Sequence, residues 1–413
     1  MNYRTEIDGL RALAIAPVIL FHAGFPAFSG GYIGVDVFFV ISGYLITSIL
    51  SADLQSGQYS MLAFYERRAR RILPALFLML AVSLLLAYAL LNPADLRDYA
   101  KSLLGSVLFL ANITAYMQSG YFDAASDIKP LMHLWSLAIE EQYYVLFPVL
   151  LAFLWRRERH ALVSVIVLLC GLSVITAEIK LNTDSSIAFF YLHSRAWELG
   201  VGALLALIVH FHTDRLSTLS ATLRQWLAVS GLFLIVYVTV MFDKSTRFPG
   251  LSALMPTIGA GLILVFATQA TWVGRVLSFR PLVVLGLISY SAYLWHQPIF
   301  AFARYRSPNH LETPVLLGLI ALTLTVAYTS WRFVEMPFRK KWQFSKRAIT
   351  WLSFGGVALF SAIALLINAK HGFPERYPKE LASAFDPYKV KEGKFCDFKK
   401  SSVWDDLDFC TLG

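Results

Sequence analysis

Charged residues are scarce in this sequence. Of its 413 residues only 15% are Asp, Glu, Lys or Arg, against about 25% in ordinary soluble proteins. Because these charges cannot cover a water-facing surface of this size, the composition excludes a soluble globular protein. The hydrophobic fraction is 57% and the net charge is +9, with the basic residues in short runs between apolar stretches. That pattern is typical of membrane topology, and nucleic-acid binding is not expected.

Cysteine is also scarce, with three in the chain. Cys170 lies in an apolar run, whereas Cys396 and Cys410 lie in the polar last part of the sequence. An oxidising compartment would allow Cys396 and Cys410 to form a disulfide, and two free thiols are the alternative. A removable signal peptide is not expected, because the first apolar stretch is too long and too polar at its N-terminal edge.

Long apolar runs are abundant. A helix needs about 20 residues to cross roughly 30 Å of hydrocarbon, and eleven stretches qualify: 10–27, 33–52, 72–91, 131–154, 161–178, 188–210, 226–242, 251–269, 282–303, 314–335 and 350–369. A twelfth, 99–117, is broken by polar residues, so its periodicity does not decide whether it spans. The sequence therefore predicts an all-α integral membrane protein with about eleven transmembrane helices.

Loop charges favour eleven spans over twelve. If 99–117 does not span and the N-terminus is cytoplasmic, 17 Arg and Lys residues fall inside and 8 outside, whereas a twelfth span reverses this bias. The prediction places the N-terminus in the cytoplasm and the C-terminus in the periplasm. It divides the chain into a ten-span domain at 1–345, an eleventh span at 346–370 and a periplasmic polar linker at 371–413.

Ionisable residues lie within several of these spans. Each costs about 2.5–3.5 kcal/mol at mid-bilayer on insertion scales, so it needs a partner, a water-filled cavity or a function. Arg11 and His22 are eleven residues apart, which places them on one helix face about 16 Å apart in depth. Their face would hold an anion at the inner side and present an imidazole nearer the outer side.

Other polar groups lie within or beside the later spans, at depths in the membrane similar to those of Arg11 and His22. Asp36 opens the second span, and Ser42 follows it where helix packing is a stronger explanation than catalysis. The arginine run at 67–71 precedes the third span and is read either as a topology signal or as a phosphate site. The fourth span carries two adjacent carboxylates, Glu140 and Glu141, which need a partner from another helix. The polar residues of the fourth and later spans are His133, Trp135, Glu140, Glu141, Arg195, Glu198, His296, Arg332, Glu335 and Arg339.

The depths of these groups predict an inner basic vestibule and an outer layer of histidines and carboxylates. A transporter or flippase for lipid-linked sugars would also place charges in its interior, so this function remains the alternative to an enzyme.

Five motifs together resemble the acyltransferase family 3 membrane proteins over about residues 3–345. They are the run 7–14 with Arg11 and His22, the run 34–44, the His133-x-Trp135-Ser136 motif, the Glu140-Glu141-Gln142 motif, and Val334-Glu335-x-Pro337-x-Arg339. Bacterial O-acetyltransferases of lipopolysaccharide O-antigen or related surface glycans show the nearest similarity. The resemblance implies a multi-pass protein of the bacterial cytoplasmic (inner) membrane.

The resemblance also implies a reaction. Acetyl-CoA would be the cytoplasmic donor, and the acceptor would be a hydroxyl of a surface glycan, O-antigen foremost, either polymerised or as a lipid-linked sugar. No metal is expected. Arg68 and Arg71, with Arg11 and Arg339, would bind the CoA phosphates. His22 would act as general base or as an acyl relay, with Glu140 or Glu141 orienting it.

The remaining residues receive secondary roles. His296 is the second catalytic candidate, although the Pro298 that follows also explains it as a polar residue at a kink. Site-supporting roles go to Asp8, Asp36, Ser42, His133, Trp135, Arg195, Glu198 and Glu335. The segment 371–413 resembles the linker that leads to a C-terminal SGNH-type domain in many such proteins. No Gly-Asp-Ser block follows, so the chain is expected to be the membrane part of a longer protein or a truncation.

Overall fold

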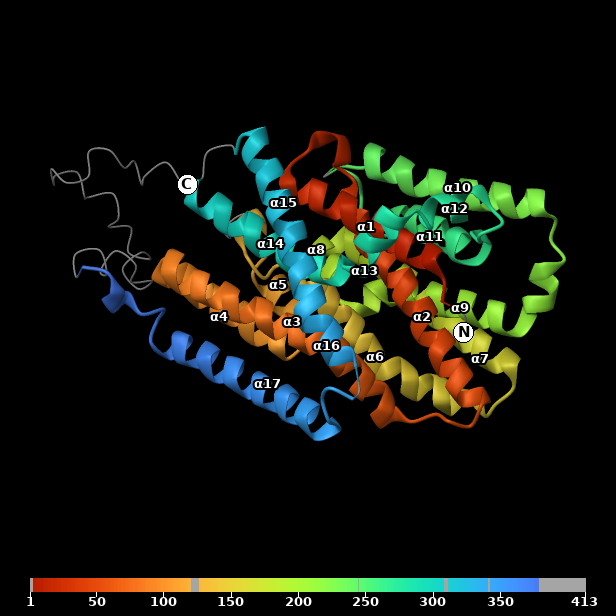
Figure 1. Cartoon of the computed structure of the whole chain (residues 1–413), viewed down its shortest axis with the longest axis horizontal. Helices are drawn as coiled ribbons and strands as arrows, with labels where there is room; N and C mark the ends of the chain where they lie inside the picture. The colour runs from red at the N-terminus through yellow and green to blue at the C-terminus, as the bar shows by residue number, and fades with distance from the viewer. Residues whose placement is uncertain (1–2, 120–125, 244, 308–310, 341, 379–413) are drawn as a thin grey trace.

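The computed structural model describes residues 3–119, 126–243, 245–307, 311–340 and 342–378. In these ranges the chain is helical and contains no strand (Figure 1). Cys396, Cys410 and most of the expected linker at 371–413 lie outside the described residues, so the disulfide stays a prediction. The chain is an all-helical, multi-pass membrane protein, as its composition indicates.

The helices follow the apolar runs closely. Their bounds are α1 (Thr5–Ala23), α2 (Gly34–Gln55), α3 (Met61–Leu90), α4 (Pro93–Val107), α5 (Ala111–Met117), α6 (Leu134–Trp155), α7 (Arg159–Thr183), α8 (Ser185–Phe190), α9 (Leu192–Ser217), α10 (Ala221–Met241), α11 (Leu254–Phe266), α12 (Trp272–Leu277), α13 (Arg280–Leu287), α14 (Ser289–Arg306), α15 (Thr313–Ser330), α16 (Met336–Arg339) and α17 (Lys346–Ala369). A π-helical turn, η5 (Trp331–Glu335), joins α15 to α16.

Eight of the described helices are long and apolar enough to cross a membrane. The three other predicted spans also fold as helices, α1, α11 and α14, but these are too short or too polar to meet the same criteria. Helix α1 carries Glu6, Asp8 and Arg11 in its first turns. Helix α11 has only 13 residues, and α14 contains serine, tyrosine, histidine and glutamine at its centre. The count of eleven and the orientation of the termini stay predictions.

The segment 99–117 does not form one spanning helix. Helix α4 has 15 residues, which at 1.5 Å per residue gives about 22 Å and falls short of the hydrocarbon thickness. The Asn92 side chain accepts the backbone N–H of Asp95 and caps this helix, and Pro93 occupies its first turn. The chain breaks at Phe109, which has φ 54°, before α5 begins. This geometry agrees with the exclusion of 99–117 from the spans.

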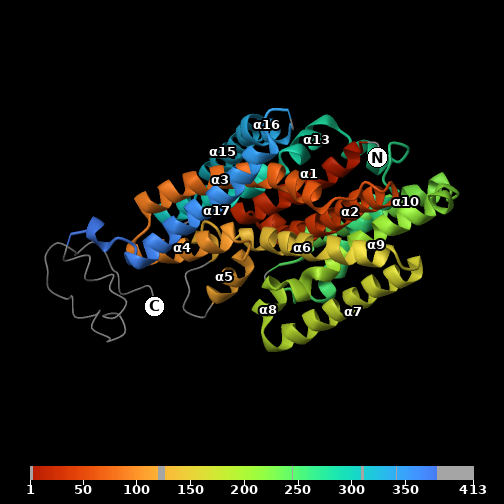
Figure 2. The ribbon, with the colours of Figure 1, turned by 90° about the horizontal axis from the view of Figure 1, so that it is seen from below.

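Helix α1 lies inside the bundle and contacts α2, α13 and α14. Helix α17 runs along α3 and α4 at one side of the molecule, and α7 lies at the other side (Figures 1 and 2). Helices α2 and α9 cross at close range. A Cβ atom on Gly43 would lie 1.9 Å from the Leu199 carbonyl oxygen, and one on Gly202 would lie 2.2 Å from that of Val40. Glycine at position 43, directly after Ser42, therefore permits the close approach of the two helices.

Candidate functional site

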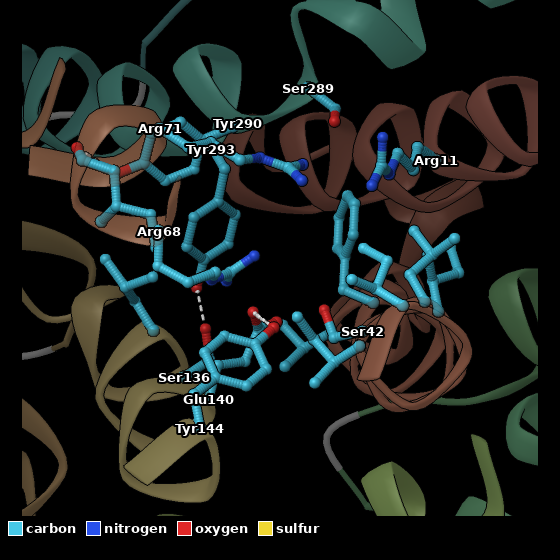
Figure 3. Close-up of a pocket in the computed structure, with 18 residues that line it drawn as sticks. Arg11, Ser42, Arg68, Arg71, Ser136, Glu140, Tyr144, Ser289, Tyr290 and Tyr293 are labelled. Atoms are coloured by element: carbon cyan, nitrogen blue, oxygen red, sulfur yellow. Dashed lines mark hydrogen bonds between the residues drawn. The ribbon is translucent and has the colours of Figure 1, made fainter. Parts of the chain in front are cut away.

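A cavity of about 160 Å³ lies among α1, α2, α3, α6 and α14. Three arginines and several hydroxyl groups line it, and Figure 3 shows the guanidinium groups pointing into it. Its polar lining residues are Arg11, Ser42, Arg68, Arg71, Ser136, Glu140, Tyr144, Ser289, Tyr290 and Tyr293. The cavity brings together three of the four arginines predicted to bind the CoA phosphates, and its lining includes Ser42.

The cavity lining carries three guanidinium groups and the Glu140 carboxylate, and the arginines differ in their partners. Arg11 forms an ion pair with Asp8 at 3.0 Å, and Arg68 lies 3.4 Å from Glu141 with its guanidinium 4.0 Å from the centre of the Tyr144 ring. Arg71 makes no hydrogen bond or ion pair within the described part of the chain. A guanidinium that faces a cavity without a partner is suited to bind an anion.

The two adjacent carboxylates of α6 belong to this cavity region. Glu140 lines the cavity and accepts a hydrogen bond from the Tyr144 hydroxyl at 2.9 Å. Glu141 pairs with Arg68 of α3, so the expected arginine partner from another helix exists. This partner, Arg68, is on α3 and is not one of the polar residues that the sequence offered on α9, on α14 and at the end of the tenth span.

The predicted orientation of His22 by Glu140 or Glu141 is wrong. The Nδ1 atom of His22 instead lies 2.8 Å from the carbonyl oxygen of Val18, one turn earlier in α1. The carboxylates are seven and eight residues beyond His133 along α6, which is about 10–12 Å of helix rise. His133 is the α6 residue that lies in the same group as His22, and the carboxylates lie at the level of the arginines.

The inner end of the site contains a second acidic and basic pair. Glu335 is fully buried at the end of the π-helical turn, where it pairs with Arg339 and accepts the Ser291 hydroxyl at 3.0 Å. Single π-helical turns are frequent at functional sites. Arg339 is not among the residues that line the cavity, but it lies close enough to Arg71 for the two charges to interact.

Asp8 also has a partner beside the start of α1. The Tyr3 hydroxyl donates to it at 2.6 Å. Burial, followed by this hydrogen bond, raises the pKa of Tyr3 to about 12. Tyr3 therefore stays a neutral donor that holds Asp8 in place beneath Arg11.

Three histidines from α1, α14 and the start of α6 meet within the bundle. The ring centres of His22 and His296 are 4.9 Å apart, and those of His296 and His133 are 5.2 Å apart. His296 is fully buried, His133 is 4% exposed, and His22 is half-buried. We call these three residues the histidine cluster. It brings together both predicted catalytic histidines and one residue predicted to support the site.

The tautomer of His22 follows from its hydrogen bond. A carbonyl oxygen can only accept, so Nδ1 carries the proton and Nε2 keeps its lone pair when the ring is neutral. The same holds for His296, whose Nδ1 lies 2.6 Å from the carbonyl oxygen of Tyr293. Both rings are thus fixed in the form in which Nε2 acts as a base or nucleophile.

Tyr293 separates the cavity from the histidine cluster. Its ring lines the cavity and lies 5.3 Å from the rings of both His133 and His296. Its hydroxyl donates to the His133 carbonyl oxygen at 2.6 Å and contacts the Ser136 hydroxyl at 2.6 Å. His22 is not among the cavity-lining residues. Ring contacts lead from Tyr293 to His296 and from His296 to His22.

A buried ion triad supports this region from α2 and α9. Arg195 lies 3.1 Å from Asp36 and 3.2 Å from Glu198, and each of the three side chains is at most 1% exposed. The Arg195 guanidinium lies 5.7 Å from the Trp135 ring, one residue before Ser136. This arrangement fits the supporting role predicted for Asp36, Trp135, Arg195 and Glu198.

A sequence profile described as "Acyltransferase domain" matches residues 4–332 of the chain, a range that contains the cavity, the histidine cluster and the ion triad. The chain belongs to this acyltransferase family. The resemblance inferred from the five motifs is confirmed.

Characterised relatives of this acyltransferase-family protein carry names from cell-wall chemistry. The chain is 33% identical over 403 residues to "Peptidoglycan O-acetyltransferase OatA" of Listeria monocytogenes, an alignment that covers 88% of this chain and 63% of that protein. It is 32% identical over 351 residues to "O-acetyltransferase OatA" of Staphylococcus aureus, covering 82% and 58%. The chain thus spans about three fifths of the length of these relatives. No solved structure matches it.

Sequence reasoning gave no site role to several hydroxyl-bearing residues that line the cavity of this family member. Tyr293 precedes His296 by three residues on α14, and this spacing placed it near the face of His296, whereas Tyr290, six residues before His296, carried no such signal. Ser136 and Tyr144 lie four residues before and after Glu140. This spacing was a usable signal, because residues four apart share a helix face. Among the described residues, no group of three or more metal-ligating side chains has the geometry to hold a metal ion.

Proposed function

We propose that this protein is an O-acetyltransferase of the bacterial cytoplasmic membrane that moves an acetyl group from acetyl-CoA on the inner side to a hydroxyl of a surface glycan. The observation that carries the proposal is an arginine-lined cavity one side chain away from a base-competent histidine. The family to which the chain belongs supports the acyl-transfer chemistry.

The donor would be held by the cavity arginines. Arg71 has no partner among the described residues, and Arg68 and Arg11 complete a positive lining for the phosphates. The volume of about 160 Å³ is smaller than the roughly 300–1,000 Å³ of pockets for drug-sized ligands. The cavity therefore suits the phosphates of acetyl-CoA and the start of its pantetheine arm, with the adenosine nearer the cytoplasm.

The chemical step would use His22 as the general base. Its Nε2 atom takes the proton of the acceptor hydroxyl while the hydroxyl oxygen attacks the thioester carbonyl carbon. The carbon–sulfur bond then breaks, and the thiolate takes a proton to leave as CoA. Because Tyr293 lies between the cavity and His22, the acetyl end of the donor must pass this side chain before transfer.

The acceptor would be a glycan outside the membrane. The relative from Listeria is named for peptidoglycan, and this favours a cell-wall glycan over the lipopolysaccharide O-antigen suggested by the motifs. Both acceptors present sugar hydroxyls on the same side of the membrane, so one chemistry serves either.

Labelled acetyl transfer tests the proposal. Membrane vesicles containing the full chain receive acetyl-CoA with a labelled acetyl group on the cytoplasmic face, and the glycan fraction is analysed by mass spectrometry. We expect a mass increase of one acetyl group per modified sugar, and peptidoglycan and O-antigen fractions are collected separately to identify the acceptor. Movement of a lipid-linked sugar without added mass would contradict the proposal and identify a flippase.

A further inference from the structure

Of the three residues in the histidine cluster, His133 has the ring nitrogens with the fewest hydrogen bonds. It is 4% exposed, and neither of its ring nitrogens has a hydrogen-bond partner. Buried polar atoms in native proteins nearly always have partners, so each exception calls for an explanation. Leaving such a group unpaired destabilises the protein, and a ligand that binds there would recover the lost free energy.

The hydrogen-bond inventory of the cluster identifies what is missing. His22 and His296 are fixed with bare Nε2 atoms, so the cluster offers two acceptors. A neutral His133 carries one N–H group on either Nδ1 or Nε2. The Leu294 backbone lies near the ring, but no acceptor meets hydrogen-bond geometry with this donor. The cluster therefore complements a group that combines a hydroxyl proton with a carbonyl oxygen, as a thioester and an attacking alcohol do.

We propose that the His133 N–H donates to the carbonyl oxygen of the acetyl thioester and stabilises the oxyanion that forms during transfer. This inference rests on the proposed function. As the acceptor oxygen bonds to the carbonyl carbon and His22 takes its proton, the carbonyl electron pair moves to the oxygen that His133 holds. When that pair returns, the carbon–sulfur bond breaks and the thiolate leaves with a proton.

The surroundings of His133 support this role. The neighbouring hydroxyls are committed, because Tyr293 donates to the His133 carbonyl oxygen and Ser136 therefore donates to Tyr293. His133 also directly precedes the 22-residue helix α6, whose positive N-terminal end favours a negative charge nearby.

Arg304 is a further donor near the cluster with an unpaired nitrogen, Nη1. Its second terminal nitrogen holds the carbonyl oxygen of His22. It lies eight residues beyond His296 on α14, which is about 12 Å along the helix away from the cavity. A thioester that arrives past Tyr293 meets His133 first, because the Tyr293 ring contacts His133 directly.

Three substitutions of one residue test the proposal. His133→Leu removes the donor, whereas His133→Asn and His133→Gln keep an N–H group near the positions of Nδ1 and Nε2. We expect His133→Leu to lower kcat by about 100- to 1,000-fold, the usual effect of losing one oxyanion donor. The KM for acetyl-CoA should not change. At least one of the two amide variants should have a kcat at least tenfold higher than that of His133→Leu.

The control is His193→Leu on α9, which replaces a histidine whose ring contacts Tyr191 outside the cluster. It should keep the wild-type kcat. Wild-type kcat in His133→Leu would overturn the proposal. Amide variants as inactive as the leucine variant would also overturn it, and they decide the matter if the leucine variant does not accumulate. Absence of acetyl transfer by the wild-type protein would instead refute the proposed function.

Discussion

The partnerless Arg71 allows a direct test of the donor site. Arg71→Ala removes a guanidinium that faces the cavity and has no protein partner among the described residues, so little native structure is lost. A hydrogen bond to a charged group contributes about 1.5–3 kcal/mol. At about 1.4 kcal/mol per tenfold change, the KM for acetyl-CoA should rise by about 10- to 150-fold. The assay measures initial transfer rates at a saturating acceptor concentration while the acetyl-CoA concentration is varied.

Arg67→Ala is the matched control for this measurement. Arg67 belongs to the same basic run, but its side chain is 40% exposed and pairs with Asp53 at 3.0 Å outside the cavity. It should leave the KM for acetyl-CoA unchanged. Equal effects of the two substitutions would show that the run acts through general charge. An unchanged KM in Arg71→Ala would refute the assignment of the cavity to the donor.

Three further substitutions test the Tyr293 side chain that separates the cavity from the histidine cluster, the ion triad, and the crossing of α2 and α9. Tyr293→Phe removes two hydrogen bonds that hold this side chain, and release of free CoA thiol without acceptor should increase as water gains access; an unchanged release contradicts a separating role. Arg195→Ala leaves two buried carboxylates without a cation and should cost about 3–5 kcal/mol, seen as a lower unfolding temperature in detergent; a temperature equal to the wild type's would exclude a stabilising triad. Gly43→Val should disrupt the α2–α9 crossing and reduce the amount of protein recovered from membranes, and full recovery would contradict the tight crossing.

The helical architecture could be predicted from the sequence because the bilayer imposes a strong pattern. Twenty apolar residues in a row have few alternatives to a helix in a membrane, and each of the eleven predicted runs is helical in the structure. The same logic identified the buried ionisable groups, because each needs compensation. Arg195 with Glu198 and Arg68 with Glu141 are such pairs.

The contacts between helices could not be predicted in the same way. Sequence spacing fixes which residues share a face of one helix, but it does not say which helix that face meets. His22 and Arg11 share a face of α1, yet only Arg11 lines the cavity, and His22 contacts His296 of α14 instead. In place of the expected carboxylate, the Val18 carbonyl of its own helix accepts the hydrogen bond of the His22 ring.

The central claim is that His22 acts on an acetyl group that the arginine cavity supplies. The most direct test compares wild-type protein with His22→Ala for two quantities, the binding of acetyl-CoA and the transfer of labelled acetyl to glycan. The account predicts unchanged binding and a transfer rate lower by about 100- to 10,000-fold, the range for loss of a general base. Transfer at the wild-type rate by a His22→Ala protein would contradict it.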